Sequence, residues 1–330
     1  LRFCATTHPI WARVMNRSST TQGVAFADDT FLMDSLPQVL HVAADSLKSF
    51  RADADLDLQP AKFKIHIKGV SHEQARALIE RCIDSDEYLT CLRPMLDDAY
   101  GCIQADGLRV AGVPVGSDAF ITNYVRSKAL DIVQDVDKLN IMKDPLTKYH
   151  LLKYCQHSRL EFLGRNVSPS QMTTPVNGIV GPQHVDWAVI QAILKVGTAG
   201  QFDTLQPDMQ KWCKHVITLP YHLGGFGITP LVQSGKAGFY SATAKFISWL
   251  GTLPNAQFWL PAHHDLNQPD TWSCQRLSAF IDLHRHFCSE LNFTEWAPPA
   301  AIASDQVPPP RSDVLTLPPP TLLATLQVLL

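Results

Sequence analysis

The chain has 330 residues, of which 45% are hydrophobic and 18% are charged. These are globular values, and the length suggests about two domains. A net charge of −3 and a pI near 6.5 exclude a uniformly basic nucleic-acid binder, although a locally basic groove is compatible with them. The eight cysteines form no CxxC pair, and no apolar run reaches the roughly 18 residues of a membrane span. We therefore expect an intracellular protein, cytoplasmic or nuclear, with reduced thiols and no membrane partner.

Residues 23–34, GVAFADDTFLMD, place two adjacent aspartates between apolar residues. The apolar residues alternate on both sides of the pair, which predicts two short strands joined at Asp28 and Asp29. Aspartate is depleted in strands and is seldom buried, so the pair needs an explanation. An ordinary hairpin turn and a metal site at the tip of two strands both provide one.

The residues that follow predict a helix and then a strand. Ser35 to Gln38 has the spacing of a capping box, and apolar residues recur every three to four positions up to Ala54. The stretch AKFKIHIKG alternates strictly, which predicts a half-buried strand with one apolar and one basic face. The apolar face carries Phe63, Ile65 and Ile67, and the basic face carries Lys62, Lys64, His66 and Lys68.

The remainder of the chain predicts mostly helices. Short strands broken by glycine and proline are expected within residues 101–118, and residues 119–166 have a helical pattern with a break near Pro145. Further helices are expected within residues 183–251. From residue 252 onward, runs of proline favour extended and poorly packed backbone, so we expect a partly disordered tail.

In this order, the elements resemble the palm of a reverse transcriptase of the kind encoded by non-LTR retroelements. The resemblance is carried by FADD in a hairpin, the helix after it, and the segment LDLQPAKFKIHIKG, in which Gln59 replaces the usual Asn. GLRVAGVPVGSD (107–118) resembles the hairpin that holds the primer terminus in that family. Residues 144–169 are similar to its helical thumb, and LPYHLGGFGI (219–228) to a segment beyond the thumb.

The resemblance covers residues 1 to about 250 and implies an α+β fold of four parts. These are a partial palm of antiparallel hairpins with packed helices (1–118), a helical thumb (119–182), a helical connection region (183–251) and the proline-rich tail (252–330).

For the acidic hairpin, the resemblance implies two-metal nucleotidyl transfer, with Mg²⁺ as the cofactor and Mn²⁺ as the alternative. Asp28 would be the metal ligand and Asp29 its less directly bound neighbour. Lys62 would lie near the departing pyrophosphate, where a lysine can neutralise or protonate developing charge. The alternative for the two aspartates is an ordinary hairpin turn without a metal. The alternative for Lys62 is a position on a solvated strand face. The substrates of the intact parent would be an RNA template, a DNA primer and deoxynucleoside triphosphates.

A further set of residues is expected to contact nucleic acid. Two glycines of the primer hairpin would let the backbone approach the primer, although turn chemistry explains them nearly as well. Basic residues on the helices between 143 and 165 are suited to tracking phosphates, although surface helices are often basic for solubility alone. The candidate contacts are Phe26, Gly112, Gly116, Lys148, Lys153, Arg159 and Arg165.

Several parts of a polymerase are expected to be missing. A reverse transcriptase needs a second aspartate-bearing strand upstream, together with fingers and a glycine loop, and the chain begins at Leu1 within an apparent helix. We therefore expect a fragment that is not a competent polymerase on its own. The alternatives are a non-catalytic nucleic-acid-binding remnant and a helical interaction protein in which FADD is accidental.

Overall fold

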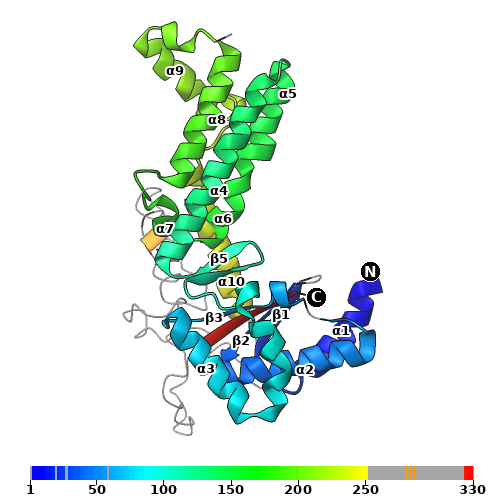
Figure 1. The fold of residues 1–330 in the computed structure, drawn as a ribbon. Coiled ribbons are helices and arrows are strands. Elements are labelled where there is room, and N and C mark those ends of the chain that lie inside the picture. Colours follow the sequence, from blue (N-terminus) through cyan, green and yellow to red (C-terminus); the bar gives the residue numbers. More distant parts are fainter. Residues whose placement is uncertain are drawn as a thin grey trace. The chain divides into compact units, whose positions relative to one another are not determined.

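Two units make up the structure, which is a computed structural model (Figure 1). Unit 1 contains residues 1–121 and 310–330, and unit 2 contains residues 122–309. The structure describes residues 2–18, 21–26, 29–57, 59–198, 200–251, 279–280, 282–283, 286 and 323–329.

Helices dominate, and the strand pairs of both sheets are antiparallel, which confirms the α+β class. In chain order, with η marking a 3₁₀-helix, unit 1 contains α1 (Arg2–Met15), β1 (Gln22–Phe26), β2 (Asp29–Ser35), α2 (Leu36–Ala54), η1 (Pro60–Lys62), β3 (Lys64–Ile67), α3 (His72–Ser85), η2 (Glu87–Leu96), η3 (Asp98–Tyr100), β4 (Gly107–Val110), β5 (Val113–Gly116) and β6 (Leu323–Leu329).

The larger sheet has the strand order β1-β2-β6-β3, and β4 and β5 form a separate hairpin. The last strand of the chain, red in Figure 1, therefore lies between two strands from the first quarter of the sequence. Its residues pair with β2 from Ser35 opposite Leu323 to Asp29 opposite Leu329, and with β3 from Ile67 opposite Ala324 to Lys64 opposite Gln327.

The core of unit 1 lies between one face of this sheet and the helices. Leu32 and Ile65 are fully buried and Ile67 is 1% exposed, whereas the neighbouring Met33 is 46% exposed. Phe63 is buried as well, so the predicted apolar face of the basic strand is confirmed. Trp11 of α1 packs edge-on against Phe50 of α2, which joins those two helices in the same core.

The C-terminal strand differs from the expectation of a poorly packed tail. Residues 252–322 lie outside the described residues, apart from short pieces between 279 and 286, but Leu323–Leu329 is a strand of the sheet. Its sequence LATLQVL alternates apolar and polar residues in the middle, which is a strand pattern. The proline runs that precede this strand predict disorder, and the strand pattern is too short to outweigh them.

The capping box expected at the start of α2 does not form. Ser35 is the N-cap residue, but its side chain makes no capping hydrogen bond. Its backbone N–H donates to Oδ1 of Asp34 at 2.6 Å, so the group that Gln38 was expected to bond is already satisfied. A complete capping box is found instead at the start of α3, between Ser71 and Gln74.

In the described part of unit 2 the regular elements are helices, and loops and one isolated antiparallel bridge, between Val176 and Ile179, connect them. Its elements are α4 (Asp118–Lys138, which starts in unit 1), η4 (Leu139–Ile141), α5 (Pro145–His150), the π-helical η5 (Leu151–Gln156), η6 (His157–Leu160), α6 (Glu161–Asn166), α7 (Pro169–Thr173), α8 (Gly181–Gly197), η7 (Phe202–Thr204), α9 (Pro207–Thr218), η8 (Tyr221–Leu223) and α10 (Leu231–Gly251). Because α10 packs on α6 and α8 packs on η5, the residues expected to form separate thumb and connection regions belong to one unit.

A buried polar contact joins three of these elements. Nε2 of His157 lies 2.9 Å from Oδ1 of Asp186, and both residues are buried. The backbone N–H of Leu231, the first residue of α10, donates to both carboxylate oxygens of Asp186, at 3.1 and 2.9 Å. Asp186 of α8 therefore satisfies the N-terminus of α10, where a negative charge is favourable.

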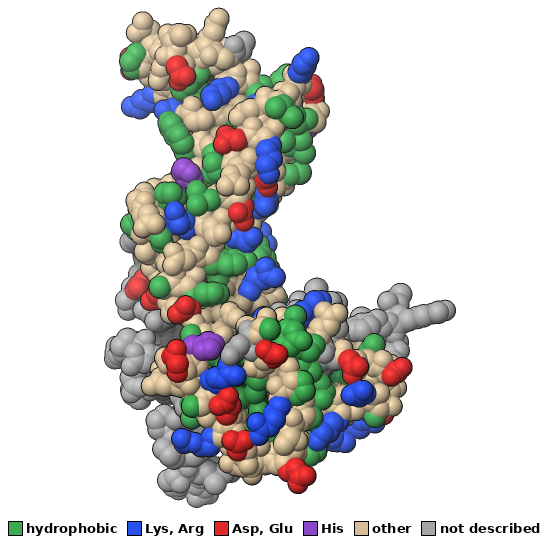
Figure 2. All heavy atoms as spheres, in the orientation of Figure 1, with side chains coloured by type: hydrophobic (Ala, Val, Ile, Leu, Met, Phe, Trp, Pro, Cys, Tyr) green, Lys and Arg blue, Asp and Glu red, His purple; other side chains and the backbone are tan. Residues whose placement is uncertain are grey.

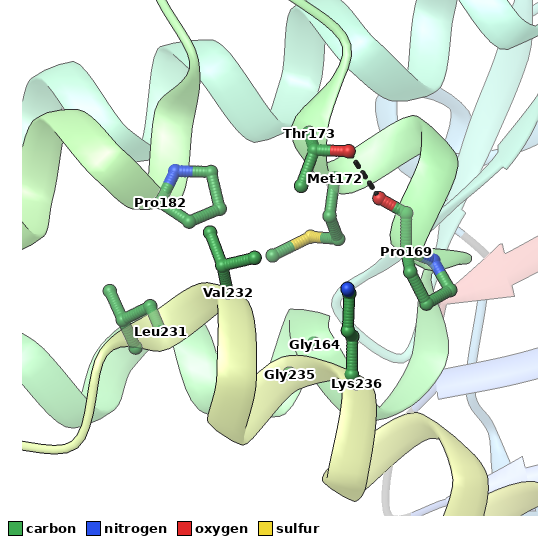
Figure 3. A pocket seen from close by; sticks show the side chains of 9 residues that line it. All are labelled: Gly164, Pro169, Met172, Thr173, Pro182, Leu231, Val232, Gly235 and Lys236. Atoms are coloured by element: carbon green, nitrogen blue, oxygen red, sulfur yellow. Dashed lines mark hydrogen bonds between the residues drawn. The ribbon is translucent and has the colours of Figure 1, made fainter. Parts of the chain in front are cut away.

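Helices α6 and α10 approach closely because glycines face each other at their contact. A Cβ atom added to Gly164 would lie 2.9 Å from Cα of Gly235, which is closer than real Cβ atoms come to backbone. Beside this contact lies a small apolar hollow, lined among others by Met172 and Val232 (Figure 3). It has room for about one water molecule, so it is no cofactor site.

Among the described residues, no helix is both long and apolar enough to cross a membrane.

The glycine contact yields a paired prediction. Gly164→Ala should lower the free energy of unfolding of unit 2 by about 1–2 kcal/mol, because the added methyl group forces α6 and α10 apart. Gly235→Ala is the matched control: its Cβ would lie 3.7 Å from Cα of Gly164, an ordinary contact, and alanine favours the helix by up to about 1 kcal/mol. Urea unfolding of both variants measures the difference. Equal stabilities of the two variants would contradict the close contact.

Candidate nucleic-acid interface and acidic hairpin

The acidic hairpin forms as two paired strands. Phe26, the last residue of β1, pairs with Asp29, the first residue of β2. Ala27 and Asp28 lie outside the described residues, as do the side chains of Phe26 and Asp29. The backbone register therefore places Asp29 at the end of the sheet, opposite Leu329 of β6 on its other side.

No group of three or more metal-ligating side chains is found among the described residues. Among the described side chains, the carboxylate nearest in sequence to Asp28 and Asp29 is that of Asp34. It accepts hydrogen bonds from the hydroxyl of Thr21 and the N–H of Ser35. A metal site at this hairpin would depend on Asp28 and Asp29. Hard carboxylate oxygens of this kind fit Mg²⁺, which usually takes one or two of them and completes its shell with water and phosphate.

Lys62 ends the 3₁₀-turn η1 and is half-buried, so it lies two residues before β3 and not within that strand as predicted. Two other members of the predicted basic face have structural partners. The ammonium of Lys64 donates to the carbonyl oxygens of Tyr100 and Gly101, at 2.6 and 3.0 Å. His66 is buried, with Nδ1 2.8 Å from the carbonyl oxygen of Gln104. The face expected to be solvated is thus partly covered by the loop that follows η3.

Both glycines of the β4–β5 hairpin have a reason within the hairpin itself. Gly112 has φ +84° and follows Ala111 at φ +47°, the signs that a two-residue hairpin loop of type I′ requires. Gly116 pairs with Gly107, and a Cβ atom at Gly116 would lie 2.2 Å from the carbonyl oxygen of Asp106. Turn and strand packing therefore account for these glycines without a primer.

The basic helical residues separate into different environments. Lys148 is 4% exposed, its ammonium donates to Oδ1 of Asn140 at 3.0 Å, and burial lowers its pKa. Arg159 is paired with Asp135 at 2.7 Å, and hydrogen bonds from Lys138 and then from Arg159 lower the pKa of that carboxyl. The side chain of Arg165 is 61% exposed. Figure 2 shows Lys and Arg side chains spaced among hydrophobic ones on the surface of unit 2.

Lys153 lies at the centre of an aromatic–lysine cluster, which we define as Tyr149, Lys153, Tyr154, Tyr221 and Phe226. The ammonium of Lys153 lies 3.8 Å from the centroid of the Tyr221 ring and donates to the carbonyl oxygen of Phe226 at 3.0 Å. The hydroxyl of Tyr149 lies 2.6 Å from that of Tyr221, and the hydroxyl of Tyr154 lies 3.4 Å from it.

The local backbone explains how the cluster is held. Lys153 and Tyr154 belong to the π-helical turn η5, a rare conformation that is frequent at functional sites. Leu152 in the same turn is fully buried and anchors it. On the opposite side, Gly227 has φ +65°, and a Cβ atom there would lie 2.9 Å from Nζ of Lys153, so glycine lets this loop approach the lysine.

Several rings of the cluster remain accessible. Tyr154 is 58% exposed, Tyr221 55% and Phe226 39%. Exposed rings beside a cation can stack on bases while the cation attracts phosphate, the combination typical of single-strand binding. Of the residues in the aromatic–lysine cluster, the sequence predicts only Lys153 as a nucleic-acid contact. The aromatic and glycine content of YHLGGFG was a signal for a functional loop, but not for its contact with η5.

Comparison with protein-family models, with curated proteins and with solved structures found no match for this chain.

The cluster predicts an unusual tyrosine titration. The ammonium of Lys153, followed by the neighbouring hydroxyls of Tyr149 and Tyr154, lowers the pKa of Tyr221 to about 8, because these groups stabilise the phenolate. Burial raises the pKa of Tyr149. Ultraviolet difference spectroscopy of the full chain should therefore detect a tyrosine that ionises near pH 8.

Tyr221→Phe should remove this transition, Lys153→Met should move it towards the ordinary tyrosine range, and Tyr154→Phe should retain a lowered pKa. A titration in which Tyr221→Phe leaves the spectrum below pH 9 unchanged would contradict the geometry of the cluster.

Proposed function

We propose that the chain is a fragment of a non-LTR retroelement reverse transcriptase that binds single-stranded nucleic acid through unit 2 and does not extend primers on its own. The observation that carries the proposed binding is the aromatic–lysine cluster, in which the Lys153 ammonium lies near three tyrosine rings, two of them exposed, and donates to a backbone carbonyl.

The chemistry of the cluster suits a flexible strand better than a duplex. Every base has an aromatic face, so exposed tyrosine rings bind unpaired bases with little sequence preference. The charge of Lys153 next to these rings adds attraction for the phosphate that links two stacked bases. Arg165 of α6 has a side chain that is 61% exposed, and its guanidinium lies 4.0 Å from the carboxylate of Glu161, so it adds only partly neutralised positive charge. Lys148 is left out of this interface because its ammonium is buried against Asn140.

For the palm part, the support comes from the acidic hairpin and the strand beside it. Two adjacent aspartates at a hairpin suit Mg²⁺ or Mn²⁺, which in the intact parent would neutralise charge on the nucleotide phosphates. A two-metal site needs a second carboxylate strand, and a strand next to β2 is the simplest way to bring another acid close to Asp29. Residues 323–329 occupy that position, and LATLQVL contains no acidic residue. We infer that Asp28 and Asp29 lack the partner that polymerisation requires.

The binding proposal is tested by fluorescence anisotropy with a labelled single-stranded RNA or DNA oligonucleotide and the full chain, over a series of salt concentrations. Tyr154→Ala and Tyr221→Ala should each weaken binding roughly tenfold, because each removes a stacking ring. Lys153→Met should reduce the slope of log affinity against log salt by about 0.7, the value for one phosphate contact on a single strand. Lys148→Met is the matched control and should leave the slope unchanged, because the ammonium of Lys148 is buried and cannot reach a phosphate of the oligonucleotide.

Wild-type affinity in Tyr154→Ala and Tyr221→Ala, or equal slopes for Lys153→Met and Lys148→Met, would contradict binding at the cluster. The same preparations, supplied with primed RNA template, deoxynucleotides and Mg²⁺, should synthesise no DNA. Synthesis that depends on Asp28 would contradict the proposed inactivity of the fragment.

A further inference from the structure

Strands β2 and β3 are separated by the width of one strand, and β6 fills this gap. They make no ladder with each other, and both pair with β6. Without β6, the backbone groups of both strands that face the gap would have no partner in the sheet. Buried N–H and C=O groups without partners are costly, so the gap favours an inserted strand.

The two walls of the gap are fixed by contacts that do not involve β6. On its other edge, β2 pairs with β1 along five residues. On the other edge of β3, the N–H of Ile65 donates to the carbonyl oxygen of Cys102 and the carbonyl of Ile65 accepts from the N–H of Gln104, both at 2.8 Å. Lys64 and His66 are tied to the same loop through their side chains. The gap is therefore a preformed acceptor for an extended segment.

The register sets the chemistry of the segment that fits. Leu326 pairs with Leu32 of β2 and with Ile65 of β3, and both of these side chains are fully buried. A charged residue at position 326 would therefore be inserted into an apolar row, which is strongly unfavourable. Gln327 falls in the alternate row, opposite Phe31 and Lys64. The site thus selects a segment with an uncharged, apolar residue at its centre.

We propose that the gap between β2 and β3 is a strand-binding site for alternately apolar extended peptides with an apolar central residue, and that residues 323–329 are its resident occupant. The segment adds backbone hydrogen bonds on both of its edges, and the alternation of apolar residues gives the specificity. This binding site is independent of nucleic-acid binding by unit 2, because it lies entirely within unit 1.

The test uses the full chain carrying Leu326→Pro, together with a labelled synthetic peptide of sequence LATLQVL. Proline in a central strand removes a ladder hydrogen bond, so the resident strand should leave the gap. The variant should bind the peptide with a stoichiometry of one and at least tenfold more tightly than the wild-type chain, whose gap is filled. Bound peptide should also restore slow hydrogen exchange in residues 29–35 and 64–67.

A peptide with Asp in place of the central leucine should not bind, and Gln327→Ala is the control variant that should retain wild-type exchange. If Leu326→Pro prevents unit 1 from folding, the LATLQVL peptide should restore its thermal transition. Unchanged exchange of β2 and β3 in Leu326→Pro would overturn the proposal. So would a variant that neither binds the peptide nor is refolded by it.

Discussion

Backbone hydrogen bonding across one gap determines how unit 1 is assembled. Strands β2 and β3 are joined by α2, and both contribute to the same core, but they are not paired with each other. They form one sheet because β6 bonds both of them, and its register sets Leu326 against the fully buried Leu32 and Ile65. The four-stranded sheet of unit 1 is therefore completed by seven residues near the end of the chain.

The same strand bears on what the chain can do. It sets Leu329 opposite Asp29, where a second carboxylate would be needed for two-metal chemistry. Unit 2 does not share this constraint, because its aromatic–lysine cluster is built by η5 and the loop around Gly227. The proposed binding surface lies within unit 2, whereas the strand that pairs with β2 beside the proposed metal site carries no acidic residue.

What could be predicted from the sequence was local. Strict alternation identified Phe63, Ile65 and Ile67 as a buried face, because strand periodicity needs only neighbouring residues. The pairing of β6 and the contact between Tyr149 and Tyr221, 72 residues apart, depend on tertiary packing that no local pattern encodes. Lys148 is an intermediate case. It precedes the fully buried Leu152 by four residues and so lies on the same helix face. This spacing indicates burial, whereas the charge of Lys148 alone predicted a surface position.

Cross-linking between β2 and β6 tests the central role of the last strand most directly. In the register described above, Met33 lies opposite Thr325, and paired antiparallel residues have Cα atoms about 4.5–5.5 Å apart, within disulfide range. The chain carrying Met33→Cys and Thr325→Cys should form this disulfide under mild oxidation, as read by mass spectrometry of the linked peptides. The chain carrying Met33→Cys and Ala324→Cys should not, because position 324 alternates to the other face. Equal cross-linking in the two chains, or none in the first, would contradict a sheet completed by residues 323–329.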